Sequence, residues 1–373
     1  MSETPNTQEQ QLGLLRDEID SIDQQIQKLI NQRASCAQRV ADVKQAFQGT
    51  KEAVFYRPER EAQVLRKVME RNGGPLDNEE MARLFREVMS ACLAHEKPMQ
   101  VAFLGPQGTF TQSAALKHFG HSVVTVPLSS IDEVFREVEA KSANYGVVPI
   151  ENSSEGMVNN TLDSFRQSNL VICGEVEMRV HQNLLVQAGT DIDNVECIYS
   201  HQQSLAQCRS WLDTHLYKAE RFAVSSNAEA ARRVAEAGEN TGKVAAIAGS
   251  MAADLYGLEI ANANIEDQPD NTTRFLIIGH NSVPSSGQDK TSILVLARNK
   301  SGALYHILEP FQRHNVSMTS IESRPSGAGL WGYVFYIDFE GHLDDANVQA
   351  VLTDLDTEVA ELRVLGSYPQ AVL

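Results

Sequence analysis

The sequence has few cysteines, little positive charge and no long apolar segment. Its five cysteines are scattered without a C-x-x-C pair, which argues against a disulfide framework or a zinc site and favours a reducing compartment. With 32 Lys and Arg against 49 Asp and Glu, the net charge of −17 argues against nucleic acid or an anionic membrane as a partner. No apolar run reaches membrane-spanning length, and the polar first residues do not resemble a signal peptide. We therefore expect a cytoplasmic protein.

The first segment, residues 1–97, is predicted to be all-helical. It has no proline from Leu12 to Phe47, and its apolar residues recur there with a period near 3.6. A helix of this length extends over roughly 50 Å and cannot bury its own apolar stripe, so we expect it to pack against other helices, including a second copy of the chain. Two more helical patterns cover Glu59–Glu70 and Asn78–Ala94. The pattern therefore predicts a helical homodimer or a higher even homo-oligomer.

The second segment, residues 98–281, alternates short apolar runs with helical stretches. This alternation is typical of an α/β fold with largely parallel sheets. The extended segment Met178–Gln187 is interpreted as a crossover between two lobes. Ligands of such sheets bind at the carboxyl ends of the strands.

The third segment, residues 290–373, follows a turn-rich linker at Asn281–Lys290. Its pattern of strand, helix, strand, strand, helix, strand predicts an α+β domain of the ferredoxin-like type. Many functions occur on that fold, so the topology alone does not assign one.

Two cations interrupt the apolar stripe of the long helix. Arg33 and Lys44 are 11 residues apart, about 16 Å along nearly one face, and a buried cation needs an anionic partner. Arg16 lies 17 residues before Arg33, about 25 Å away and rotated around the helix. Arg16 therefore cannot share a site with Arg33 on the same helix, but it could complete a site on another chain.

Residues 12–97 resemble the all-helical chorismate mutase family in the motifs LLRDEID, NQRASCAQRVADVK, RPERE and LFREVMS. The resemblance implies an intertwined dimer in which Arg33, Lys44 and Arg60 hold the substrate, Glu61 accepts its hydroxyl group and Arg16 comes from the partner subunit. A pericyclic rearrangement needs no nucleophile and no cofactor, since oriented charges suffice.

Glu96 departs from the glutamine that this family places beside the ether oxygen. A carboxylate there would repel the negative charge that develops on that oxygen, so we expect Glu96 to be protonated in the active enzyme. Mutase activity should then fall as the pH rises, and Glu96→Gln should remove that fall.

Residues 101–279 resemble the prephenate dehydratase family in the motifs GPQGTFT, VVPIENS, YSHQQSLAQC and TRF. The resemblance implies two α/β lobes, like those of a type II periplasmic solute-binding protein, with the essential threonine at Thr273. It also implies that Asn152, Ser200, Gln207 and Thr109 contact the substrate. The sequence has Gln202 and Gln203 where the family has Pro and Gln.

The proton for the leaving hydroxyl group has two possible sources. Thr273 donates it directly, or Thr273 positions a better acid such as His201 or Glu151. The turns at Gly105–Thr111, Glu151–Ser154 and Tyr199–His201 are either ordinary helix N-caps or helix starts whose backbone N–H groups bind the carboxylates of a dianion.

The motifs GALYHILEPF and IESRPSG resemble the phenylalanine-binding ACT domain. The resemblance implies an allosteric site that inhibits the enzyme when it is occupied. The expected contacts are Gly302, Ala303, Leu304, Glu322, Ser323, Arg324 and Trp331.

Together the resemblances imply conversion of chorismate to prephenate and then to phenylpyruvate, inhibited by phenylalanine. Three alternatives compete. An NAD-dependent dehydrogenase module is disfavoured because neither GPQGTF nor GSMAADLYG supplies a G-x-G-x-x-G fingerprint. A dehydratase that prefers arogenate, and a non-catalytic two-lobed binding module, both stay open.

Overall fold

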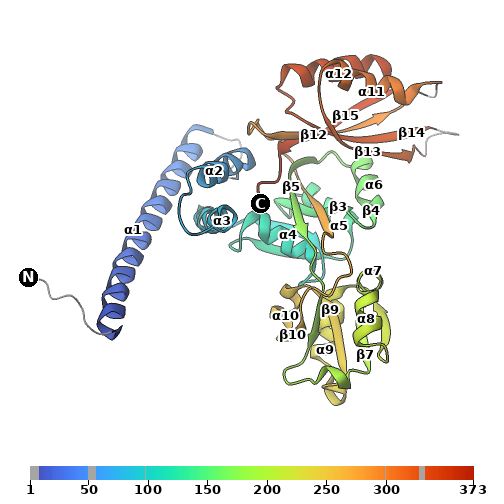
Figure 1. Ribbon diagram of the computed structural model, residues 1–373. Coiled ribbons are helices and arrows are strands. Elements are labelled where there is room, and N and C mark those ends of the chain that lie inside the picture. Colours follow the sequence, from blue (N-terminus) through green and yellow to red (C-terminus); the bar gives the residue numbers. More distant parts are fainter. Residues whose placement is uncertain (1–7, 49–55, 97, 299, 327–331) are drawn as a thin grey trace, which may run out of the picture.

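The computed structural model describes residues 8–48, 56–96, 98–298, 300–326 and 332–373. It contains a helical N-terminal region, two sheets flanked by helices, and a C-terminal antiparallel sheet with two helices (Figure 1). The predicted fold class is therefore confirmed. No helix in these ranges has the length and apolarity that crossing a bilayer requires.

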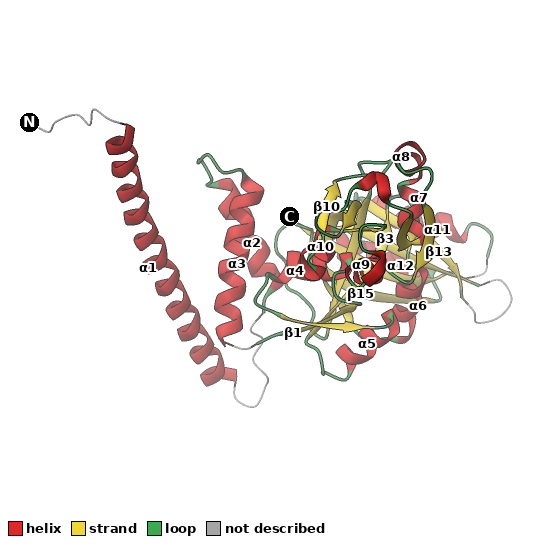
Figure 2. Cartoon of the chain, turned by 90° about the horizontal axis from the view of Figure 1, so that it is seen from below, coloured by secondary structure: helices red, strands yellow, loops and turns green. Residues whose placement is uncertain are grey.

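Helix α1 (Gln8–Gln48) has 41 residues and leaves its apolar stripe exposed. The exposed fractions of its large apolar residues run from 39% to 87% in Leu12, Leu14, Leu15, Ile19, Ile22, Ile26, Leu29, Ile30, Val40, Val43 and Phe47. Helices α2 (Pro58–Glu70) and α3 (Asn78–Glu96) pack on each other, and α1 contacts α3. Figure 2 shows α2 and α3 between α1 and the α/β part of the molecule. One chain alone therefore does not bury the stripe.

The first lobe is built on a sheet of order β2-β1-β3-β11-β5, with β4 paired to β3. Its strands are β1 (Gln100–Leu104), β2 (Val124–Leu128), β3 (Tyr145–Asn152), β4 (Gly156–Met157), β5 (Val171–Arg179) and β11 (Thr272–Gly279), and its helices are α4 (Phe110–Phe119), α5 (Ile131–Glu139) and α6 (Asn159–Gln167).

The second lobe has a sheet of order β10-β6-β9-β7-β8. Its strands are β6 (Asn183–Val186), β7 (Cys197–His201), β8 (Glu220–Val224), β9 (Val244–Ala248) and β10 (Glu259–Asn262), and its helices are α7 (Gln202–Gln207), α8 (Arg209–His215), α9 (Asn227–Ala235), α10 (Ser250–Tyr256) and the short 3₁₀ turns η1 (Ile192–Asn194) and η2 (Gly238–Asn240).

Both sheets are mixed, so the prediction of largely parallel sheets was only partly right. Strand β1 pairs in parallel with β2 and β3, and β7 with β8 and β9, as expected. Strand β11 is antiparallel to β3 and β5, and β6 is antiparallel to β9 and β10. The reason is that the chain crosses between lobes twice, at residues 180–182 and 263–271, and β11 starts at the end where β3 and β5 finish. The predicted crossover within Met178–Gln187 is confirmed.

The C-terminal sheet has the order β13-β14-β12-β15 and is antiparallel throughout. Its strands are β12 (Asp289–Leu296), β13 (Met318–Pro325), β14 (Tyr333–Glu340) and β15 (Glu361–Pro369), and its helices are α11 (Ala303–Arg313) and α12 (Ala346–Glu358). One face packs on these helices. The other face joins the core of the first lobe through Leu294, Val334, Tyr336, Leu365 and Tyr368. The predicted ferredoxin-like order is confirmed.

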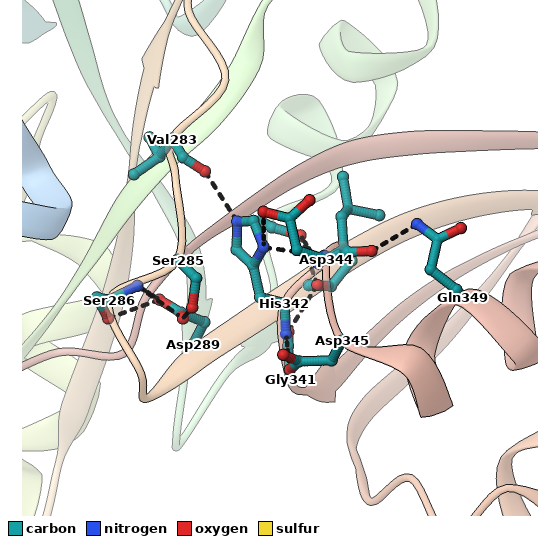
Figure 3. A network of polar contacts seen from close by, with 12 residues as sticks. Val283, Ser285, Ser286, Asp289, Gly341, His342, Asp344, Asp345 and Gln349 are labelled. Carbon is teal, nitrogen blue, oxygen red and sulfur yellow. Dashed lines mark hydrogen bonds and ion pairs between the residues drawn. The ribbon is translucent and has the colours of Figure 1, made fainter.

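The linker before β12 is fixed to the C-terminal domain by hydrogen bonds (Figure 3). Ser285 Oγ donates to Asp289 Oδ2 at 2.8 Å, and Ser286 Oγ donates to Asp289 Oδ1 at 2.6 Å. The ring of His342, which is buried, lies with Nε2 2.9 Å from the carbonyl oxygen of Val283. The segment is therefore a structured joint.

Candidate functional site

The helical region brings only part of the predicted mutase site together. Arg33 is half-buried on α1. Burial raises the pKa of Glu61 above its ordinary value and outweighs the opposite effects of Arg86 and, smallest of all, of Arg33. Lys44 is half-buried, whereas Arg16 and Arg60 are exposed. Glu96 ends α3, but its side chain lies outside the described residues.

Arg86 on α3 is a member of this cluster that sequence reasoning missed. Its Nε donates to Glu61 Oε1 at 3.2 Å, and its Nη1 donates to the carbonyl oxygen of Lys117 at 2.7 Å. Only 9% of the Arg86 side chain and 15% of the Glu61 side chain are exposed. The motif LFREVMS contained Arg86, but nothing in its spacing distinguished that arginine from a surface cation.

The Glu61–Arg86 pair borders a junction of all three parts of the chain. A cavity of about 30 Å³ there is lined by Glu61 and Arg86 from the helices, by His118 and Glu175 from the first lobe, and by the C-terminal residues 369–373. Tyr56 Oη lies 2.9 Å from His118 Nε2. Burial, followed by the charge of Arg86, lowers the pKa of His118 to about 3, so its ring is neutral.

Thr273 lies at the start of β11, where the two lobes meet, and is 8% exposed. Its Oγ1 accepts a hydrogen bond of 2.7 Å from Asn152 Nδ2, directly across the sheet. The Asn152 amide also donates to Asn271 Oδ1 at 3.1 Å. Among the described residues, none accepts a hydrogen bond from the Thr273 hydroxyl group.

Residues of the second lobe continue this polar cluster. Gln207 Oε1 accepts from Asn271 Nδ2 at 3.1 Å and from Gln182 Nε2 at 3.2 Å. Ser200 is fully buried, and its Oγ donates to Ile247 O at 2.7 Å and lies 3.1 Å from Asn227 Oδ1. The structure thus gathers Thr273, Asn152 and Gln207 in one network, with Ser200 at its far end.

Most of the backbone amides that we expected to bind carboxylates are occupied inside the protein. The N–H groups of Ser154 and Glu155 donate to Asn152 Oδ1, and that of His201 donates to Asn227 Oδ1. The prediction of free helix-start amides is therefore wrong for these two loops. The first loop leads into β4 and not into a helix, and the amides named are occupied by Asn152 and by Asn227 of α9. The start of α4 differs, since its N-cap residue Thr109 makes no side-chain capping bond.

The loop before α4 closes onto the second lobe. Gly108 has φ +84°, and a Cβ there would lie 3.3 Å from Leu255 Cδ2 and 3.4 Å from Ala252 Cα on α10. Only glycine combines this conformation with so close an approach. The half-buried Thr109 is thereby held at the inter-lobe junction, where its Oγ1 donates to Leu104 O at 3.2 Å.

The two alternative proton donors differ in their position. Glu151 is paired with Arg274 in the β3–β11 register, while Asn152 is paired with Thr273, so strand alternation puts Glu151 on the other face. His201 is exposed at the end of β7, and its Nδ1 accepts from the N–H of Gln203. Of the two, only His201 belongs to the second lobe.

Arg274, the neighbour of Thr273, joins a buried charge cluster with the C-terminal domain. Its Nε donates to Glu175 Oε2 at 2.8 Å, and its Nη1 donates to Asp338 Oδ2 at 2.5 Å. Lys290 Nζ lies 2.8 Å from the same Glu175 oxygen. Side-chain exposures of 9%, 1% and 11% for Arg274, Glu175 and Lys290 show that these charges depend on one another.

The predicted phenylalanine contacts fall on two separate elements. Gly302 has φ +77° and caps α11, whose first residues Ala303 and Leu304 are half-buried and 44% exposed respectively. On β13, Glu322 is half-buried and Ser323 is exposed. Trp331 lies outside the described residues.

Arg324 faces the first lobe in this structure. Its Nη2 donates to Asp163 Oδ2 on α6 at 2.9 Å, and its Nη1 donates to Asn159. It therefore ties the edge of the C-terminal sheet to α6.

Comparison with known proteins identifies three matching family models. These are chorismate mutase type II over residues 15–97, prephenate dehydratase over residues 101–283 and the ACT domain over residues 291–357. A bifunctional chorismate mutase/prephenate dehydratase of Pseudomonas aeruginosa is 58% identical over 97% of this chain and 99% of its own length. The protein of the same description from Aquifex aeolicus is 44% identical over 98% and 99%.

A solved structure adds to these similarities. The prephenate dehydratase of Arthrobacter aurescens in complex with L-Phe is 34% identical and superposes with a TM-score of 0.68, covering 73% of this chain and 90% of that one. The similarity therefore extends over nearly the whole of this chain in sequence and over most of it in structure.

Proposed function

Because this chain belongs to the family of bifunctional chorismate mutase/prephenate dehydratases with a C-terminal ACT domain, we propose that separate groups of its residues carry out the two reactions. The chain rearranges chorismate to prephenate and then converts prephenate to phenylpyruvate. We assign the first reaction to residues 1–97 and the second to residues 98–281, with regulation in residues 290–373.

For the mutase reaction, Arg33, Lys44 and Arg60 hold the substrate, and Arg16 of the partner subunit completes the site. The Glu61 carboxylate accepts a hydrogen bond from the substrate hydroxyl group. The electrostatic effect of Arg33 on α1 on the Glu61 carboxyl on α2 supports this assignment. The exposed stripe of α1 supports an even oligomer, because the burial of so many apolar side chains needs a second helix of the same kind.

For the dehydratase reaction, the free proton of the Thr273 hydroxyl group is the observation that supports the proposal most strongly. In prephenate the bond to the ring carboxylate breaks, its electron pair enters the ring, and the bond to the ring hydroxyl group breaks. One proton converts that leaving group to water, and carbon dioxide departs. Thr273 supplies this proton directly or relays it from His201.

The same cleft has few groups that would bind the two carboxylates of prephenate. The uncapped start of α4 at Thr109 offers backbone N–H groups and the positive end of the helix dipole. The Gln207 amide adds a side-chain donor. Because hydrogen-bond donors of this kind can bind carboxylates without Lys or Arg, the site can hold a dianion without a local excess of positive charge.

The C-terminal domain senses phenylalanine through Gly302, Ala303, Leu304, Glu322, Ser323, Arg324 and Trp331. The relative solved with L-Phe supports this assignment. The buried ion pairs of Arg274, Glu175, Lys290 and Asp338 link the C-terminal domain to β11 at the residue next to Thr273. A change in that domain can therefore alter the position of Thr273. We expect the enzyme in the cytoplasm.

A coupled assay tests these proposals. Chorismate, prephenate and arogenate are supplied separately, and phenylpyruvate and phenylalanine are followed with and without added phenylalanine. We expect phenylpyruvate from chorismate and from prephenate, with inhibition by phenylalanine. Loss of chorismate without phenylpyruvate would leave only the mutase, and faster turnover of arogenate than of prephenate would replace the second substrate.

A further inference from the structure

We propose that Asn271 and Gln182 are positioning residues of the dehydratase reaction. They fix the direction of a series of neutral hydrogen bonds and thereby leave the Thr273 hydroxyl proton and the Gln207 NH₂ group without an acceptor among the described residues. The proposal rests on the assigned role of Thr273. Both residues lie in the crossovers between the lobes, and they are 3% and 1% exposed.

The direction of the chain is set at one end by the backbone of the first lobe. The N–H groups of Ser154 and Glu155 donate to one oxygen, Asn152 Oδ1, at 3.0 and 3.2 Å. A backbone N–H can only donate, so this end of the Asn152 amide must be its oxygen. The amide nitrogen then faces Thr273 Oγ1 and Asn271 Oδ1, and its two protons are both used.

Asn271 transmits this direction to the second lobe. Because its Oδ1 accepts from Asn152, its Nδ2 must face Gln207 Oε1, at 3.1 Å. If the Asn271 amide were turned over, its NH₂ group would face the NH₂ group of Asn152. The orientation of Asn271 thus follows from that of Asn152, and Gln207 must present its oxygen to Asn271.

The other end of the chain is set independently by the backbone of the second lobe. The N–H of His201 donates to Asn227 Oδ1 at 3.1 Å, so Asn227 Nδ2 faces Gln182 Oε1 at 3.3 Å and Ser204 Oγ at 2.8 Å. Gln182 Nε2 then donates to Ser204 Oγ at 3.1 Å and to Gln207 Oε1 at 3.2 Å. The two ends agree on the orientation of Gln207.

This agreement has a chemical consequence. With Oε1 of Gln207 held by two donors, its NH₂ group has no acceptor among the described residues. The Thr273 hydroxyl group likewise accepts from Asn152 and keeps its own proton. A substrate that lies between the lobes therefore meets two donors, and the Gln207 oxygen is not turned toward it. Two donors suit a carboxylate and a leaving hydroxyl group.

The substitution Asn271→Asp tests the direction of the chain while it preserves its shape. The new carboxylate cannot donate to Gln207 Oε1, so Gln207 turns or is repelled. We expect kcat for prephenate to fall on the order of 100-fold at pH 8, as when one preorganised donor is lost. When the new carboxyl group is protonated it donates again, and burial brings this about at a higher pH than in water. The ratio of mutant to wild-type kcat should therefore rise at least tenfold between pH 8 and pH 5.

Three further proteins complete the test. The control Asn183→Asp makes the same change at an asparagine that is also 3% exposed. Its Nδ2 donates to Ala248 O and takes no part in the series of hydrogen bonds between Asn152 and Asn227. Its ratio of mutant to wild-type kcat should therefore not change with pH. Asn271→Ala loses activity without recovery at low pH. If Asn271→Asp fails to fold, as shown by a circular-dichroism spectrum or thermal unfolding profile unlike that of the wild type, Gln182→Glu poses the same question.

The outcomes separate this inference from the proposed function. A wild-type enzyme that does not convert prephenate contradicts the proposed function. An active wild type with a kcat ratio for Asn271→Asp that is constant with pH overturns the inference alone, because a merely structural role would give a loss without recovery.

Discussion

Two inactive variants of the mutase site should restore each other's activity when they are mixed. Arg16 and Arg33 lie 17 residues apart on α1, roughly 25 Å along its axis, so one helix cannot bring both to one substrate. Arg16→Ala and Arg33→Ala should each reduce chorismate turnover at least 100-fold. In a mixed dimer, one site carries both changes and the other carries neither.

The expected magnitude follows from random exchange. Half of the dimers are mixed and half of their sites are intact, so about one quarter of the wild-type activity should return. The assay follows the loss of chorismate after the two proteins are incubated together, with dehydratase activity as the control for intact protein. If subunit exchange is verified by mass spectrometry and the mixture stays as inactive as its components, the shared site is refuted.

Other predictions concern the interfaces between the parts of the chain. Glu175→Gln leaves Arg274 and Lys290 without their shared carboxylate and should lower the free energy of unfolding by about 3 kcal/mol in urea titrations, whereas the exposed Glu177→Gln should change it by less than about 0.5 kcal/mol; equal losses would contradict the cluster. His118 binds a proton below pH 6.5 when unfolded but only near pH 3 when folded, so its contribution to stability is complete above pH 6.5 and is lost as the pH falls. The free energy of unfolding should fall by about 1 kcal/mol between pH 6.5 and 5.5, and this fall should be absent in His118→Gln. If the variant shows the same fall, His118 is not its cause. Calorimetric titration with L-phenylalanine should give saturable binding below 1 mM, and no heat at millimolar concentration would remove the sensor function.

The sequence was sufficient to predict most of the fold because each part has its own periodicity. The apolar stripe formed the long helix α1, the apolar runs of the lobes formed strands, and the C-terminal domain has the expected order of strands and helices. The direction of β11 was not predictable in this way. It depends on where the chain returns from the second lobe, and no local pattern in Thr272–Gly279 encodes that return.

The candidate site was predictable where a motif supplied the residue and less so where a partner was needed. Thr273, Asn152 and Gln207 came from motifs and lie in one network. Arg86 and Asn271 were missed because their importance comes from contacts with residues 25 and 64 positions away. The backbone amides of two loops were misjudged because the sequence does not show that Asn152 and Asn227 accept hydrogen bonds from them, nor that the first loop leads into β4 and not into a helix.

The assignment of two reactions to two sites is tested most directly by measuring both reactions in two variants. Arg33→Ala and Thr273→Ala are each supplied with chorismate and, separately, with prephenate. We predict that Arg33→Ala loses chorismate turnover at least 100-fold and keeps conversion of prephenate within about twofold, while Thr273→Ala shows the reverse. Loss of both reactions in either variant, with the protein still folded, would contradict the account.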